Sequence, residues 1–103
     1  MGMSTKTGQR NTDKLLKSLY KALLSLNTPS ECSNFLQDLC TPAELEALAD
    51  RWEVVQLVDQ GVPYRQIQQT TNVSTATITR VARALAHGAG GYRSLIDRLQ
   101  GNK

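Results

Sequence analysis

The sequence predicts an all-α protein with about six helices. Three observations support this fold class. Apolar residues recur at helical spacing along most of the chain, start and stop signals separate the segments, and no run alternates as a strand would. The 103 residues suggest one domain, and 40% hydrophobic with 20% charged residues is typical of a soluble globular protein. A chain this short buries only a small core and has little stability to spare, so association with a second copy would stabilise it.

The two ends of the chain differ in composition from this helical body. Residues 1–12 are polar and lack the apolar segment of a signal peptide. We interpret residues 1–11 as a flexible N-terminal arm or a cloning remnant, residues 12–100 as the helical domain and residues 101–103 as a tail. No apolar run approaches the ~20 residues that a membrane span needs, so we expect a cytoplasmic protein without membrane contact.

Three helices are predicted in the first half. A leucine-rich stripe indicates a helix over 12–26, and Asn27–Ser30 interrupts it. Thr41–Glu44 is a strong start signal for a later helix, because Thr caps, Pro takes the first helical position and Glu completes a capping box. We expect Gly61 to end that helix. Between these two lies a short helix with the apolar positions Cys32, Phe35, Leu36 and Leu39.

A compact pair of helices and a final helix are predicted in the second half. Pro63 begins the first member of the pair, which runs to about residue 70. Residues 71–73 turn the chain, with Asn72 where a left-handed backbone is needed. Ser74 caps the second member, which runs to about residue 86. A last helix over 92–99 follows a break at Gly88, Gly90 and Gly91.

Residues 63–86 together have the pattern of a helix-turn-helix. Its apolar checkpoints are Ile67, Val73, Ile78 and Val81. Gln68 departs from the pattern, because a small residue often lies where the two helices approach. The second helix begins with small hydroxyl side chains, and these allow a helix N-terminus to enter a major groove where long side chains would hold it away.

The charge distribution favours a phosphate-binding surface on this pair. Residues 60–96 contain no acid but hold Arg65, Arg80, Arg83 and Arg93, whereas residues 31–59 contain seven acids and only Arg51. Chance clustering on a solvated face explains the charges equally well, and helix-turn-helix geometry also occurs without DNA binding. The residues expected to face double-stranded DNA are Arg65, Gln66, Gln68, Gln69, Ser74, Thr75, Ala76, Thr77, Thr79, Arg80 and Arg83.

The residues that could carry catalysis or hold a metal are few. Cys32 and Cys40 are expected to be reduced, because eight positions along a helix are too far apart for a bridge. A zinc site would need more ligands than the chain offers. His87 reads as a helix C-terminal residue, where a cation is favoured, rather than as a base. We find no nucleophile–base pair, and we therefore expect no enzymatic activity and no cofactor.

The segment CTPAELEALADRWEVVQLVDQG, with ATITR at residues 76–80, resembles the Trp repressor family over residues 12–100. The continuation RVARALAHGAGGYRSL is more similar to the YerC/YecD-type relatives, which are uncharacterised regulators. The resemblance implies a six-helix intertwined homodimer, with reading heads one DNA turn (~34 Å) apart on a pseudo-palindromic operator. It implies a transcriptional regulator, a repressor, whose Arg65 contacts a base and whose Gln68, Thr75, Ala76, Thr77 and Thr79 face DNA.

The same resemblance places an effector pocket at Thr41, Arg51, Arg80, Val81 and Ala84. Arg51 and Arg80 match two arginines that hold an indole ring. However, Val81 replaces a Gly that leaves room for the ring, Ala84 replaces a Ser that engages the amino group, and Trp52 replaces a smaller residue. We therefore expect that L-tryptophan is not the effector, and any effector is unknown. For Arg51 a salt bridge with a nearby acid stays open, and for Arg80 a phosphate contact.

A second class of function also stays open: a helical dimeric protein-interaction module whose basic face meets an acidic partner. Steep salt dependence and competition by a specific sequence would identify DNA binding instead.

Overall fold

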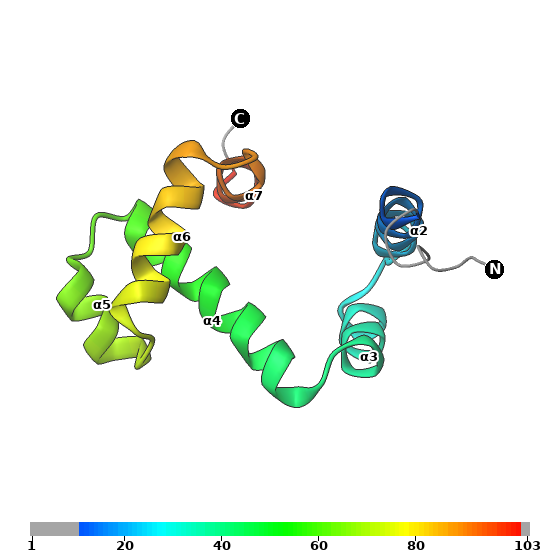
Figure 1. Ribbon diagram of the computed structural model, residues 1–103, viewed down its shortest axis with the longest axis horizontal. Coiled ribbons are helices and arrows are strands. Elements are labelled where there is room, and N and C mark those ends of the chain that lie inside the picture. Colours follow the sequence, from blue (N-terminus) through cyan, green and yellow to red (C-terminus); the bar gives the residue numbers. More distant parts are fainter. Residues whose placement is uncertain (1–10, 102–103) are drawn as a thin grey trace. The chain divides into compact units, whose positions relative to one another are not determined.

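The computed structural model describes residues 11–101, whose regular elements are all helices (Figure 1). The all-α expectation is therefore confirmed. The predicted arm, apart from residue 11, and residues 102–103 of the predicted tail lie outside the described residues. The helices are α2 (Thr12–Leu24), α3 (Pro29–Leu39), α4 (Pro42–Asp59), α5 (Tyr64–Thr71), α6 (Thr75–His87) and α7 (Gly91–Leu99).

The chain divides into two compact units, with the boundary between Leu39 and Cys40. The first unit contains α2 and α3, and the second contains α4 to α7. No helix of the described residues is long and apolar enough to cross a membrane.

In the first unit, hydroxyl groups determine where the helices begin and end. The predicted helix over 12–26 stops at Leu24, because the hydroxyl of Ser25 donates to the Ala22 carbonyl at 2.8 Å. The N–H groups of Ser25 and Leu26 bond three residues back and so tighten the last turn. The expected break at 27–30 is shorter than predicted. Thr28 Oγ1 accepts from the Glu31 N–H at 3.0 Å, and α3 begins at Pro29.

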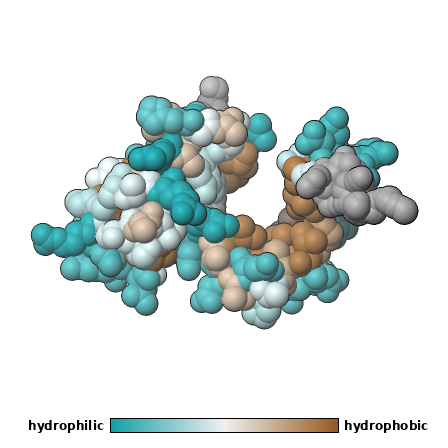
Figure 2. Space-filling model, in the orientation of Figure 1, coloured by the Kyte–Doolittle hydropathy of each residue, from teal (hydrophilic) through white to brown (hydrophobic). Residues whose placement is uncertain are grey.

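Both helices of the first unit leave much of their apolar surface uncovered. Neither α2 nor α3 contains a buried residue. Leu15 is 64% exposed and Leu39 is 50% exposed, and Figure 2 shows hydrophobic surface in one view of the molecule. Leucine stripes of this kind are stable only when something covers them.

The predicted limits of α4 are confirmed by its hydrogen bonds. The N–H of Glu44 donates to Thr41 Oγ1 at 3.1 Å, and the N–H of Thr41 donates to Glu44 Oε1 at 2.8 Å, so the capping box is complete. At the other end Gly61 has φ +84°, a left-handed backbone that suits glycine.

The helix pair that follows differs from the prediction by one residue at each end of α5. Pro63 is the cap before α5 rather than its first residue. The helix extends to Thr71, whose hydroxyl donates to the Ile67 carbonyl at 2.7 Å and accepts from the Val73 N–H at 3.2 Å. Asn72 has φ 62°, the left-handed conformation expected of it. The turn between the helices is therefore 72–74.

At the junction of α6 and α7 the glycines have separate roles. Ser74 caps α6, since its Oγ accepts from the Thr77 N–H at 3.1 Å, and His87 is the last residue of that helix, as expected. Gly88 ends α6. The expectation that Gly90 and Gly91 also end it is wrong, because Gly90 is the left-handed cap of α7 and Gly91 is its first residue.

The core of the second unit contains all four predicted checkpoints of the helix pair. The buried residues are Val54, Val55, Ile67, Val73, Ile78, Val81 and Ile96. Helix α4 packs against α5 and α6, and α6 packs against α7. Burying each such side chain stabilises the fold by about 1.5–3 kcal/mol. This small core therefore holds α5 and α6 against α4.

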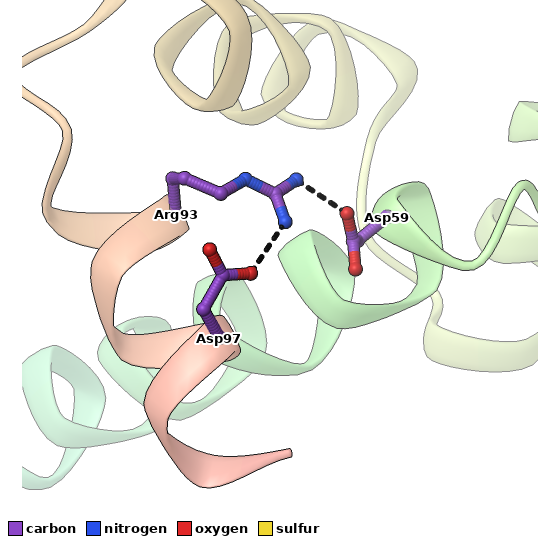
Figure 3. A network of polar contacts seen from close by, with 3 residues as sticks. All are labelled: Asp59, Arg93 and Asp97. Carbon is purple, nitrogen blue, oxygen red and sulfur yellow. Dashed lines mark hydrogen bonds and ion pairs between the residues drawn. The ribbon is translucent and has the colours of Figure 1, made fainter. Parts of the chain in front are cut away.

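Helix α7 is also tied to α4 by polar and aromatic contacts (Figure 3). The Arg93 guanidinium donates to Asp59 of α4 at 2.5 Å and to Asp97 of α7 at 3.0 Å. The rings of Trp52 and Tyr92 lie 6.4 Å apart at a tilt of 32°.

The cysteines are both free, as expected, although the single helix assumed for both is wrong. Cys32 lies in α3, whereas Cys40 follows the end of that helix, so the two do not share one continuous helix.

Candidate nucleic-acid interface

The candidate site is the outer face of α5, the 72–74 turn and α6. Its inner side is held by Ile67 and Ile78, each 0% exposed, and by Val81 at 2%. Because these residues are buried, the opposite side of each helix faces outward, while Leu85 of α6 also packs against the core.

The predicted DNA-facing residues lie on this outer face with one exception. Arg65, Gln66, Gln68 and Gln69 on α5 are exposed, as are Ser74, Thr75, Ala76, Thr79, Arg80 and Arg83. Thr77 is half-buried. Gln68 points to solvent and so does not separate the two helices.

The N-terminus of α6 explains why Thr77 differs. The Ser74 hydroxyl accepts the Thr77 N–H and donates to Thr77 Oγ1, both at 3.1 Å. Thr77 is therefore partly used within the cap, whereas Thr75, Ala76 and Thr79 present their side chains outward. The first N–H groups of a helix have no intrahelical partner and favour an anion.

The guanidinium groups of this surface are not neutralised. Among the described residues, the ion pairs present both involve Arg93. Arg65, Arg80 and Arg83 thus keep their charge available. Arg93 does not belong with them, because hydrogen bonds to Asp59 and to Asp97 occupy it and raise its pKa above the ordinary arginine value. The acid-free stretch of sequence had concealed this pairing.

Two residues of the predicted effector pocket, Arg51 and Ala84, line different cavities of the second unit. Arg51 is half-buried and forms no ion pair within the described residues. It lines a cavity of about 250 Å³ beside the turn, together with Ala47, Asp50, Asn72, Val73, Ser74 and Thr77. Ala84 lines another, of about 430 Å³, with Ala89, Gly90, Gly91, Tyr92 and Leu95.

The other three residues of that pocket line neither of these two cavities. Thr41 is the α4 cap, Arg80 is exposed, and Val81 belongs to the core. Sequence reasoning missed that Asp50 and Asn72 share a cavity with Arg51. Only the packing of α4 beside the turn places these residues together. Within residues 11–101 no group of His, Cys, Asp or Glu could hold a metal ion.

The fold and the exposed face are those of a small all-α, DNA-binding regulator of transcription. The family model described as "Trp repressor protein" matches residues 14–100. The chain belongs to the Trp repressor family.

Individual relatives agree with this assignment. The uncharacterized protein YerC of Bacillus subtilis is 41% identical over 87 residues, which is 84% of each chain. A Trp operon repressor homolog of Mannheimia succiniciproducens is 38% identical over 74% of this chain and 75% of its own. The crystal structure of a TrpR-like protein from Eubacterium eligens has a TM-score of 0.83 at 36% identity, and the match covers 87% of this chain and 93% of that one.

Proposed function

We propose that this protein is a sequence-specific transcriptional regulator, a repressor, which binds a pseudo-palindromic operator as a homodimer through α5 and α6. One observation carries the proposal. Helix α6 is held by Ile78 and Val81 on its inner side. On its outer side it presents small side chains and two arginines that form no ion pair within residues 11–101. A helix with these properties can lie in a major groove with its N-terminal turn at the base edges.

The outer side chains support separate roles in this complex. Arg65 and the α5 glutamines have the donors that read purines, since Arg pairs with guanine and Gln with adenine. Thr75, Ala76 and Thr79 can contact thymine methyl groups. Arg80 and Arg83 lie further along α6, where they suit phosphate oxygens.

The homodimer is supported by the exposed apolar faces. No apolar residue of α2 or α3 is fully buried, and on α7 Leu95 and Leu99 are 40% and 67% exposed. A second identical chain would cover such faces symmetrically, and two-fold symmetry would give two reading heads.

We also infer that L-tryptophan is not the effector. Val81 is a core residue, so its side chain fills space at the position where the resemblance requires glycine. The cavity residues Arg51 and Ala84 lie in different cavities. Calorimetric titration with L-tryptophan should give no saturable heat, and tight saturable binding would contradict this inference. The regulator would act in the cytoplasm, where bacterial-type operators lie.

The decisive experiment selects bound duplexes from a random DNA pool and then measures binding to the selected duplex and to a scrambled one. The wild-type protein should prefer the selected duplex by a large factor, and binding should weaken steeply with salt. Ala76→Glu should remove this preference, because it places a carboxylate at the front of α6. Ser94→Glu on exposed α7 is the charge-matched control and should retain it.

Two results would contradict the proposal. One is failure of the wild-type protein to enrich any sequence. The other is an Ala76→Glu protein that is folded and still discriminates the selected duplex from the scrambled one. Binding to acidic proteins without binding to DNA would instead support an interaction module.

A further inference from the structure

We propose that Lys14, Lys17 and Lys21 on α2 form a second DNA-binding surface, which contacts the phosphate backbone without reading sequence. This surface, here called the lysine stripe, lies in the first unit, outside the α5–α6 interface. The inference rests on the proposed function, since it assumes that DNA is the polyanion the protein binds.

The first observation is the geometry of the stripe. Spacings of three and four residues place the three lysines on one side of a helix. Each of them is exposed, and none forms an ion pair within the described residues. Asp13 is the one acid of α2, and it lies in the first turn. Asp13 lies four positions before Lys17 and forms no ion pair with it within the described residues, so the stripe keeps a net positive charge along two turns.

The second observation is that the lysine stripe lies opposite the apolar stripe. At 100° per residue, Leu15, Leu19 and Leu23 centre on the side of α2 away from the three lysines. When a second chain covers the apolar side, the lysines stay in solvent. A membrane would need the same apolar side, so the proposed dimer leaves only the charged side available to a partner.

The third observation is how the two basic residue types are divided. Within residues 11–101, lysine occurs only on α2, whereas every arginine lies in the second unit. A guanidinium forms paired, directional bonds with a base edge, while an ammonium is a compact point charge. This division fits base reading by Arg65 on α5 and backbone contact without base reading by α2.

The test measures the salt dependence of binding to the selected and the scrambled duplexes with the Lys14→Gln/Lys17→Gln/Lys21→Gln protein. Gln has nearly the helix propensity of Lys, and circular dichroism should confirm folding. Each lost phosphate contact should reduce the slope of log K against log salt by about 0.9. The two duplexes should lose affinity by the same factor, so the preference for the selected duplex should persist.

The matched control is Ser30→Glu/Asn34→Asp/Gln37→Glu, which lowers the net charge by the same amount on exposed positions of α3. It should leave the salt slope close to the wild-type value. Equal effects in the two triple variants would overturn the proposal, because net charge alone would explain them. An unchanged salt slope in the lysine variant would also overturn the proposal. This holds even if that variant loses binding to anionic vesicles, because the stripe would then bind a membrane instead of DNA.

Failure of this proposal is distinguishable from failure of the proposed function. If the wild-type protein enriches a sequence and the lysine variant keeps its salt slope, the stripe proposal alone fails. If no sequence is enriched but the lysine variant still loses slope on scrambled DNA, the proposed operator binding fails and the stripe stands.

Discussion

Individual residues on α5 and α6 divide into those that hold the helices and those that are free to bind. Ile67 and Ile78 have no exposed surface, whereas Arg65 and Arg80 are exposed and unpaired. The difference is a consequence of helical periodicity, which alternates buried and exposed positions every three to four residues. Binding residues can therefore be changed here with little effect on the fold.

Arg65→Ala should weaken binding to the selected duplex by about 1–3 kcal/mol, with a much smaller loss on scrambled DNA. The reason is that a guanidinium which pairs with a base distinguishes sequences, while one on phosphate does not. Arg98→Ala, which removes an exposed arginine of α7, is the control. Equal losses on both duplexes would show that Arg65 contacts only the backbone.

Two neighbouring glycines also differ sharply in what they tolerate. A Cβ at Gly88 would lie 2.5 Å from the Ala84 carbonyl oxygen, whereas a Cβ at Gly91 would meet nothing within 4 Å. Gly88→Ala should therefore destabilise the protein by more than ~1 kcal/mol, and Gly91→Ala should be neutral or slightly stabilising. Thermal unfolding of both variants checks this. Equal melting temperatures would mean that the end of α6 shifts freely.

At the scale of elements, α4 is the helix against which the proposed DNA-binding helices, α5 and α6, pack. Its central valines, Val54 and Val55, are buried with residues of α5, α6 and α7. The capping box at Thr41 and the left-handed Gly61 give this helix well-defined ends. Because α7 joins the same core through Ile96, the position of α7 and the positions of α5 and α6 depend on one another.

The Asp59–Arg93–Asp97 cluster should make the docking of α7 sensitive to salt. Asp59→Asn should lower the melting temperature at low salt, and molar salt should reduce the difference, because exposed ion pairs are screened. Arg98→Gln, which removes an unpaired arginine, should show no such dependence. A salt-independent loss in the Asp59→Asn protein would indicate that packing rather than charge is responsible.

The contribution of Arg93 to the stability of this cluster should not depend on pH in the neutral range. The hydrogen bonds to Asp59 and Asp97 raise the pKa of Arg93 in the folded protein. A base with a raised pKa contributes its full stabilisation below the unfolded pKa and loses it only as pH rises through the folded value. That window is strongly alkaline, so Arg93 should remain charged throughout the neutral range.

At the scale of the whole molecule, the second unit has a core and the first has none of its own. The buried residues all come from α4, the 72–74 turn, α5, α6 and α7, while α2 and α3 contribute none. Two leucine-bearing helices without buried residues are unstable by themselves in water. Association with a second chain in the proposed homodimer would bury their apolar residues and stabilise both helices.

Leu15→Ala should weaken this association, whereas Leu24→Ala should not. Leu15 lies on the apolar side of α2, and a leucine buried by a partner costs about 2–5 kcal/mol when truncated. Leu24 is 84% exposed and lies away from that side, so it is the matched control. Sedimentation and the dependence of melting temperature on protein concentration measure the effect. A wild-type protein that is monomeric at all concentrations would contradict the dimer.

The sequence by itself determined the helical segments, the caps at Thr41 and Ser74 and the buried face of the α5–α6 pair. These features depend on groups within about four residues of one another: Thr41 with Glu44, Ser74 with Thr77, Asn72 with its own backbone. The resemblance carried by 40–61 and 76–80 also led to the correct family, because those motifs lie in short continuous segments.

Only the tertiary structure decided the contacts between distant segments. Asp59 and Arg93 are 34 positions apart, and their pairing removes from the basic face an arginine that composition had assigned to it. Packing also separates Arg51 from Ala84 and leaves α2 without a core. Local patterns specify what each helix can bury, but the partner that buries it is a property of the folded assembly.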